Sequence, residues 1–542
     1  MTERGRWLWA AAGVLLAGAL LRLLALGREG LWCDEAYTAL LIRQPPGELI
    51  ASLLGQDDAP PLFYLLQKLI TSLLGDGEGA LRLLPALSGI AGIGVLLASG
   101  ERAARTWSAA IFATSAFAVF YARQARSYAL VMLLVLIVIQ CARGLLSGRR
   151  GGGLGLAVAG TLLCLTHHLG GLMVATSLVL WPLFGRRTVG AGRWLAWHAV
   201  PLLTWGALLF LAGDQLATHA RLNTWMGEFW RSTPLAVAPL LSLGAFSPEV
   251  LPANLRAVPM PSAGPTSALW GVLSALAAAA ALVAALIRRR EAAIEAAFLF
   301  LPLAALVAIS LVTTPIYVLG RTDAIAYPAF ALLLGRGLAR LPRSFASGAL
   351  VLWTALSVAA LAPGYGIGSP RGTKGADRDL ATDMVAAGLA PHDWLVHGFL
   401  TAPSLEYYLD RHRAPHVAAW FPPEAAENPA GVLPTSIASL PIHLDQALSL
   451  REEMEQAMPE DASAWILALD ARSSSTLAPL TAEQIGYPTN LLVYALSGEA
   501  PITPLRTYRQ DWVGGRRLLL RLPRAEWVPV DSLPPIRTAE GG

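Results

Sequence analysis

The stretch that decides the fold is YARQARSY, residues 121–128, which lies inside an apolar segment at residues 107–142. By its length alone, that segment could form one long helix. Arg105 precedes it and Arg143 follows it, and arginines next to membrane spans collect in cytoplasmic loops. If both flanks lie on the inner side, the segment must cross the membrane twice. We therefore expect a turn at residues 123–126, on the outer side.

The composition places the chain in a membrane. Of its 542 residues, 55% are hydrophobic and 14% are charged, and the mean hydropathy is +0.51. Soluble domains carry roughly 25% charged residues. The net charge of +4 forms no basic stripe on a soluble domain, so the sequence gives no sign of nucleic-acid binding. The three cysteines show no paired spacing, which predicts neither a disulfide framework nor a cysteine metal site.

The arginine rule also orders the other apolar segments. A membrane span takes about 20 mostly apolar residues. Arginine-rich loops alternate along the chain, which places the N-terminus inside and the C-terminus outside. The first segment is expected to stay as an uncleaved helix, since it is long and more spans follow it. The predicted spans, about eleven, are at residues 7–26, 80–98, 107–121, 128–146, 153–166, 169–184, 194–212, 267–287, 292–312, 324–339 and 345–362.

Two long outer loops are expected between these spans, at residues 27–79 and 213–266. Aromatic residues such as Trp225 and Trp230 favour the membrane interface, so amphipathic helices are expected in these loops. A second tight outer turn is predicted at residues 167–171, because the segment around it also has basic flanks.

The chain changes character after residue 362, where the hydropathy falls and helices alternate with strands. This alternation is typical of a small α/β domain. The predicted fold is therefore an α-helical multi-pass membrane protein over residues 1–362, followed by an extracytoplasmic α/β domain over residues 363–542. In that domain we expect helices at residues 377–387, 404–409 and 444–458 and strands at residues 394–399, 464–469 and 516–522.

An acidic pair, Asp34 and Glu35, follows the first span directly. Carboxylates are costly in hydrocarbon, so two of them beside a membrane suggest chemistry at the interface. A solvated loop that happens to carry acids is the alternative. The neighbouring Cys33 is expected to be a packing residue.

Several basic side chains fall on the predicted outer side, against the usual inner bias. Arg123, Arg126 and Arg321 could hold a lipid phosphate, since a guanidinium group fits phosphate oxygens and keeps its charge. They could instead reach lipid headgroups or form ion pairs that lock helices together, and for Arg22 we favour one of these two roles over phosphate binding. The adjacent His167 and His168 could bind phosphate, donate a proton, ligate a metal or make interfacial hydrogen bonds.

In their order along the chain, these motifs resemble a known family. One helix is followed by LWCDEAY at residues 31–37, DAPPLFY at 58–64, ALRLLP at 80–85 and YARQARSY at 121–128. This order is similar to that of the GT-C membrane glycosyltransferases, in the branch of protein O-mannosyltransferases and lipid A aminoarabinose transferases. The resemblance covers roughly the first 340 residues. Two departures concern sugar and acceptor choice. Ala59 stands where the family often has histidine, and residues 123–126 read Arg-Gln-Ala-Arg where the family often has Gln-Glu-Ala-Arg.

The resemblance implies a transferase that acts on the outer face of the cell membrane. The donor would be a polyprenyl-phosphate sugar, and the acceptor an envelope glycan, lipid or protein. Asp34 would be the general base of an inverting transfer, with Glu35 assisting. No cofactor or metal is expected, and membrane lipid is the other partner. Arg126, Arg321, Arg123 and Tyr128 would hold the donor phosphate, and Asp58, His167 and His168 would contact substrate.

Two other functions remain open at this point. A transporter or flippase for a lipid-linked glycan would also use charges inside the membrane. The chain lacks the internal repeat that many transporters show. A non-catalytic scaffold is the third possibility, against which the combination of Asp34 with outer arginines weighs.

Overall fold

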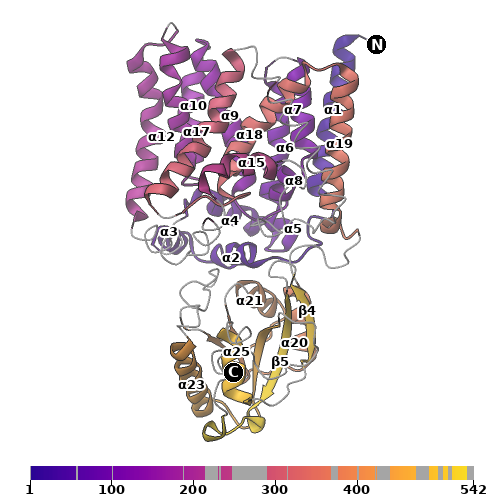
Figure 1. Ribbon diagram of the computed structural model, residues 1–542, viewed down its shortest axis with the longest axis vertical. Helices are drawn as coiled ribbons and strands as arrows, with labels where there is room; N and C mark the ends of the chain where they lie inside the picture. Colours follow the sequence, from indigo (N-terminus) through magenta and orange to yellow (C-terminus); the bar gives the residue numbers. More distant parts are fainter. Residues whose placement is uncertain are drawn as a thin grey trace. The chain divides into compact units, whose positions relative to one another are not determined.

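The computed structural model divides the chain into two compact units. The first comprises Met1–Glu29 and Leu41–Gly372, and the second comprises Gly30–Leu40 and Thr373–Gly542 (Figure 1). The second unit therefore combines the tail with a short segment of the loop predicted at residues 27–79. The structure describes residues 2–55, 59–100, 102–186, 188–213, 230, 234–246, 283, 290–313, 315–367, 376–398, 402–421, 423, 440–470, 488–498, 504–510 and 515–533.

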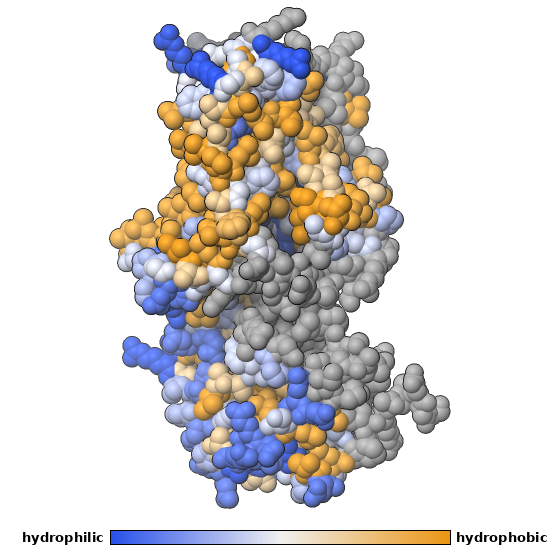
Figure 2. All heavy atoms as spheres, turned by 90° about the vertical axis from the view of Figure 1, so that its left-hand side faces the viewer, coloured by the Kyte–Doolittle hydropathy of each residue, from blue (hydrophilic) through white to orange (hydrophobic). Residues whose placement is uncertain are grey.

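The first unit, here called the membrane unit, is a bundle of helices. Helices α9 and α18 are buried along most of their length, whereas α10 and α12 carry many exposed leucines and valines. Figure 2 shows such apolar side chains spread over one face of this unit. An apolar outer surface is what hydrocarbon requires, because lipid tails replace water as the solvent. Its helices are α1 (Glu3–Leu23), α3 (Pro46–Gly55), α4 (Leu62–Leu74), α5 (Glu78–Leu81), α6 (Leu83–Ala98), α7 (Arg102–Thr114), α8 (Ala116–Ala122), α9 (Tyr128–Leu146), α10 (Gly152–Cys164), α11 (Gly170–Val179), α12 (Ala191–Leu211), α15 (Ala238–Phe246), α17 (Arg290–Val312), α18 (Tyr327–Leu338) and α19 (Arg343–Leu361), with a π-helix at Trp181–Gly185 and 3₁₀ turns at Leu235–Val237, Thr322–Ala326 and Ala362–Tyr365.

Six helices of the described residues are long and apolar enough to cross a membrane. This confirms a multi-pass membrane protein. Helices occupy ten of the eleven predicted spans, and the span predicted at residues 267–287 lies outside the described residues apart from Val283. The total of eleven spans stays a prediction. The amphipathic helices expected at residues 213–266 fall largely outside the described residues, whereas the loop at 27–79 does contain short helices.

Both predicted turns are present, although the second lies at residues 165–169 rather than 167–171, and their outer position stays a prediction. Helix α8 ends at Ala122 and α9 begins at Tyr128, so the segment at 107–142 is not one helix. Helix α10 ends at Cys164 and α11 begins at Gly170. The two turns place Arg126 and His167 at helix ends rather than in helix interiors.

A break inside the predicted span at residues 107–121 was not expected. Helix α7 ends at Thr114, and Ser115 adopts an extended conformation before α8 begins. The Ser115 side chain accepts a hydrogen bond from the amide of Ala118, at 3.4 Å, and so caps α8. The break leaves the last carbonyls of α7 without helical partners.

The second unit, here called the α/β domain, is built on a five-stranded sheet in the order β2-β1-β3-β5-β4. Strand β1 is parallel to β2 and β3, whereas β5 is antiparallel to β3 and β4. An apolar core containing Trp394 and Val396 lies between one sheet face and two helices, α23 and α25. The elements are α2 (Cys33–Leu41, which spans the boundary between the units), α20 (Asp377–Ala386), β1 (Trp394–His397), α21 (Ala402–Arg411), β2 (Val417–Trp420), α23 (Leu440–Ala457), β3 (Ser463–Asp470), α25 (Pro488–Ser497), β4 (Arg506–Gln510) and β5 (Gly515–Pro523), with 3₁₀ turns at Arg524–Glu526 and Val530–Ser532.

All six elements predicted for this domain are present, with ends that shift by a few residues. Strands β2 and β4 and helix α25 were not predicted. Strand β2 has only four residues, and its side chains show no clear alternation of exposed and buried positions. Strand β2 is defined by its hydrogen bonds to β1, and its own four residues do not predict this pairing.

Candidate functional site

Three loops of the membrane unit meet at the start of α9. Arg321 donates from Nε to the hydroxyl of Tyr128, the first residue of α9, at 3.3 Å. The ring of His167, from the loop before α11, lies 6.0 Å from the Tyr128 ring, centroid to centroid. Arg126 lies close enough to His167 to influence its charge. We call these four residues the loop cluster: Arg126, Tyr128, His167 and Arg321.

The Arg321 loop is held in place from two sides. Gly320 adopts a positive φ of 75°, a conformation that favours glycine. Its carbonyl accepts a hydrogen bond from the hydroxyl of Tyr121, whose ring also packs 4.5 Å from the Tyr128 ring. The amide of Val318 donates to Thr322 Oγ1 at 2.8 Å. The backbone beside Arg321 is therefore fixed to α8 and α9.

A buried carboxylate follows this loop. Asp323 is fully buried and accepts a hydrogen bond from Ser242 Oγ at 2.5 Å. The hydroxyl of Tyr317 lies 2.7 Å from the same Ser242 oxygen. This chain of hydrogen bonds ties the loop to α15 and limits the movement of Arg321.

The loop cluster carries a positive field. The pKa of His167 is lowered to about 3. Burial is the largest cause, and the neighbouring His168, Arg126 and Arg321 contribute to the same shift. His167 Nδ1 accepts a hydrogen bond from the amide of Leu169 at 3.2 Å, so Nε2 carries its proton. The imidazole is therefore a neutral donor at physiological pH. Two guanidinium groups and such a donor would suit an anion with several oxygens.

Arg123 and Arg126 have different surroundings, although they lie only three positions apart in the sequence. Arg123 is buried, and it donates to the carbonyl oxygens of Leu24 at 2.6 Å and Ala25 at 3.1 Å. Its guanidinium group also lies over the Tyr365 ring, at 4.4 Å from the centroid. Arg126 is half-buried. Arg123 therefore fixes the backbone after α1, whereas Arg126 keeps exposed surface.

Arg82 and Arg22 bind backbone carbonyls in the same way as Arg123. Arg82 is buried and donates to Leu26 O at 3.1 Å and Glu29 O at 2.8 Å. Arg22 is fully buried, and it donates to Phe112 O at 2.9 Å and Ala113 O at 2.8 Å. These are the carbonyls that the break at Ser115 leaves without helical partners. Arg22 thus ties α1 to α7 through backbone carbonyls rather than through an ion pair. The role of Arg82 was missed in the sequence, where only its place beside a helix start could have indicated it.

The acidic pair lies in the first turn of α2, in the second unit. Asp34 is half-buried and Glu35 is fully buried. Thr38 donates to the backbone oxygen of Asp34 at 2.9 Å. Just before the pair, the amide of Leu31 donates to the hydroxyl of Tyr408 at 2.7 Å, which ties this stretch to α21. A helix N-terminus favours negative charge, so Asp34 is placed where a carboxylate is stable.

The remaining predicted residues are placed as follows. His168 is half-buried, and its carbonyl accepts a hydrogen bond from Trp205 Nε1 at 2.7 Å. Cys33 is buried, in accord with a packing role. Asp58 lies outside the described residues. Among the described residues, the group able to hold a metal ion is in the α/β domain, at His397, Glu406 and His416.

The chain matches no protein-family model, and no curated protein is significantly similar to it in sequence. Solved structures are similar to it in fold. The oligosaccharyltransferase of Archaeoglobus fulgidus, tethered to an acceptor peptide with an NVT sequon, has a TM-score of 0.50 at 13% identity over 95% of this chain and 77% of that one. ArnT from Cupriavidus metallidurans bound to undecaprenyl phosphate has a TM-score of 0.42 at 16% identity over 97% and 100%. Arabinofuranosyltransferase AftD from Mycobacteria has a TM-score of 0.46 at 16% identity over 97% and 42%. The chain has a GT-C-like fold.

Proposed function

We propose that the protein is a membrane glycosyltransferase that takes its sugar from a polyprenyl-phosphate donor. The observation that carries this proposal is the loop cluster. There Arg321 donates to the Tyr128 hydroxyl, and the positive charges of Arg126 and Arg321 both lower the pKa of His167. A lipid phosphate needs cationic groups close to the membrane, and guanidinium groups bind it bidentately. The GT-C-like fold and the resemblance of the motifs support the same reading.

In this proposal, Arg126 and Arg321 hold the donor phosphate and stabilise the charge that grows on it as the glycosidic bond breaks. The Nε2 proton of His167 is available as a further donor to a phosphate oxygen. Tyr128 orients Arg321 through the hydrogen bond to Nε. Arg123 was predicted to bind the phosphate, but its bonds to the backbone after α1 favour a positioning role. That backbone leads directly into the stretch that carries Asp34.

Asp34 accepts the proton of an acceptor hydroxyl as the new bond forms, and attack from the opposite side inverts the anomeric carbon. Its half-buried position leaves the carboxylate partly accessible. Glu35 is buried, which favours a supporting role in α2 for it. The substrate contacts of His168 and Asp58 are part of the proposal. If the acceptor is itself a phosphate, no base is required and Asp34 only positions groups.

We further propose that the loop cluster and the α/β domain face the outer side of the membrane. The alternation of arginine-rich loops supports this orientation. Labelling of single cysteines with an impermeant reagent, in a background without the native cysteines, tests it. Protection of a cysteine placed in the α/β domain would contradict the orientation.

Mass spectrometry of envelope glycans, lipids and proteins, in cells with and without this protein, tests the function. A sugar that disappears with the protein, and returns with the wild type but not with Asp34→Asn, would identify donor and acceptor class together. An unchanged set of glycans together with altered transport of a lipid-linked glycan would favour a flippase instead.

A further inference from the structure

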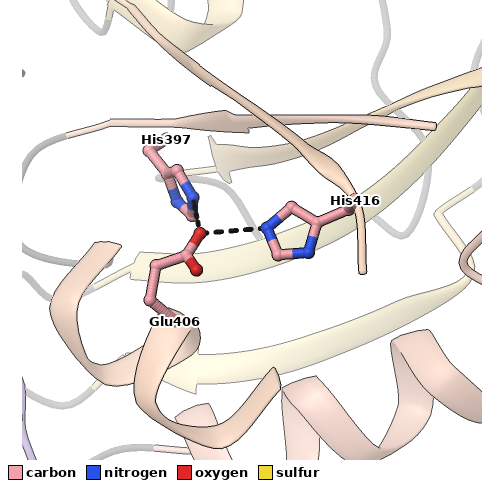
Figure 3. Close-up of side chains that lie close together, drawn as sticks. All are labelled: His397, Glu406 and His416. Carbon is pink, nitrogen blue, oxygen red and sulfur yellow. Dashed lines mark hydrogen bonds and ion pairs between the residues drawn. The ribbon is translucent and has the colours of Figure 1, made fainter. Parts of the chain in front are cut away.

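Two histidines and a glutamate of the α/β domain converge on one point. Glu406 Oε1 lies 2.5 Å from His397 Nε2 and 3.0 Å from His416 Nε2. Figure 3 shows both imidazole rings turned toward this carboxylate. The three candidate ligand atoms all lie within 4.8 Å of one another. The proposed transfer reaction uses none of these residues.

The fold brings the three residues together from separate elements. His397 is the last residue of β1, Glu406 lies on α21, and His416 directly precedes β2. Strands β1 and β2 are parallel neighbours, with His397 paired to Trp420. Side chains alternate along a strand, so His397 lies on the sheet face opposite to the core side chains Trp394 and Val396. Helix α21 covers this second face and supplies the carboxylate.

Burial fits the group to a metal ion. The side chains of His397 and His416 are 0% and 7% exposed, and that of Glu406 is 31% exposed. His397 Nδ1 is buried and makes no hydrogen bond within the described structure. The exposed part of Glu406 opens the group to solvent on one side.

Hydrogen bonding outside the group also prepares it. His416 Nδ1 donates to the carbonyl oxygen of Ala414 at 3.0 Å. A metal-binding histidine usually donates from its second nitrogen to such a carbonyl, which fixes the ring and leaves the other nitrogen for the metal.

We propose that His397, Glu406 and His416 form a zinc(II) site in the α/β domain. Zinc binds imidazole nitrogen at about 2.0–2.1 Å and carboxylate oxygen at about 2.0–2.2 Å. A tetrahedron with such bonds separates its ligand atoms by roughly 3.3 Å, so Glu406 Oε1 has to move away from His397 Nε2, which lies 2.5 Å from it, to admit the ion. Two histidines and one glutamate leave a fourth position, on the side where Glu406 is exposed. This position would take water or an anionic oxygen ligand such as phosphate or carboxylate.

Zinc binding fixes which ring nitrogen carries a proton. Without metal, the Nε2 atoms of His397 and His416 both face Glu406 Oε1, and His416 Nδ1 donates to the carbonyl oxygen of Ala414. With zinc, both Nε2 atoms bind the ion, and the proton of each neutral imidazole is on Nδ1.

The test uses the full chain without a histidine tag, purified in detergent and stripped with a chelator. Cobalt(II) serves as a spectroscopic substitute for zinc. We expect one equivalent of Co²⁺ to give visible absorption bands of a tetrahedral site, and Zn²⁺ to displace it. Zn²⁺ should also raise the unfolding temperature of the wild type.

Glu406→Gln keeps the shape of the side chain and removes its charge, and His416→Gln removes a less buried ligand as a second variant. Each should lower Zn²⁺ affinity at least tenfold and weaken the cobalt bands. His392→Ala is the matched control, because His392 is an exposed histidine of the same domain, 3.9 Å from Asp461. It should bind as the wild type does.

Either of two results would overturn the site: no tetrahedral cobalt bands in the folded wild type, or equal Zn²⁺ affinity in Glu406→Gln, His416→Gln and the wild type. The outcome is separate from that of the proposed function, since the bands and affinities are measured without sugar donor or acceptor.

Discussion

Five arginines of the membrane unit lie in two different regions. At the junction of α1 with α6, α7 and α8, Arg22, Arg82 and Arg123 are buried and donate to backbone carbonyls. In the loop cluster, Arg126 and Arg321 are half-buried and lie beside a phenol and an imidazole. Arginine thus stabilises bends of the backbone in one region and leaves a positive charge partly exposed in the other. Its role depends on whether its N–H groups are bonded to backbone carbonyls.

The largest expected effect is at Asp34, the proposed general base. Asp34→Asn keeps the shape of the side chain and removes its charge. On a hydroxyl acceptor we expect turnover to fall by about 10²–10⁴-fold, the usual contribution of a general base. Glu35→Gln should cost less, because Glu35 is buried in α2. Single-turnover rates measure both, and full turnover by Asp34→Asn would remove its role as base.

The loop cluster should respond to the loss of one guanidinium group. Arg126→Ala should lower the single-turnover rate by about 10²–10³-fold, as for the removal of a donor to a developing negative charge. Arg126→Lys should retain part of the rate, since lysine offers a point charge without the bidentate fork.

The matched control for Arg126 is Arg149→Ala, an exposed arginine beyond the other end of α9. It should leave the rate unchanged. Equal rates for folded Arg126→Ala and the wild type would show that the two regions do not differ in the proposed way.

The buried region should respond in stability instead. Arg22→Met leaves the carbonyls of Phe112 and Ala113 without their donors inside the bundle. Orphaned buried groups of this kind cost about 1–3 kcal/mol, so we expect unfolding to become easier by roughly 2–3 kcal/mol. Thermal unfolding in detergent measures this. A rate loss per folded molecule as large as that of Arg126→Ala, with unchanged stability, would contradict the distinction.

The smallest expected effect is a pH dependence at His167. Its pKa is about 3 in the folded protein, whereas histidine in an unfolded chain has a pKa of about 6.5. The unfolded state therefore binds more protons between these values, and the folded state loses stability as the pH falls through this window.

Between pH 7 and pH 5, the wild type should lose up to about 2 kcal/mol more than His167→Gln does. A phosphate in the loop cluster should reduce this difference, because an anion raises the pKa of His167. Denaturation at the two pH values, with and without undecaprenyl phosphate, measures both effects. Identical acid sensitivity of the two proteins would show that His167 is not held neutral.

The sequence predicted the turns of the membrane unit well, because the arginine rule depends on residue type and position alone. It could not separate Arg123 from Arg126, since both lie in the same turn and differ only in which carbonyls come within reach. The break at Ser115 was also missed, because its orphaned carbonyls are satisfied by Arg22 from a distant helix. The convergence of His397, Glu406 and His416 depends on the pairing of β1 with β2. The sequence of a four-residue strand does not predict which strand it pairs with.

The central claim is that the half-buried arginines, and not the buried ones, bind a lipid phosphate. Native mass spectrometry of the detergent-purified protein with undecaprenyl phosphate or undecaprenol tests it most directly. We predict that the wild type and Arg22→Met prefer the phosphate, and that Arg126→Ala and Arg321→Ala each weaken phosphate binding at least tenfold and leave undecaprenol binding unchanged. Equal phosphate binding by the wild type, Arg126→Ala and Arg321→Ala would contradict the account.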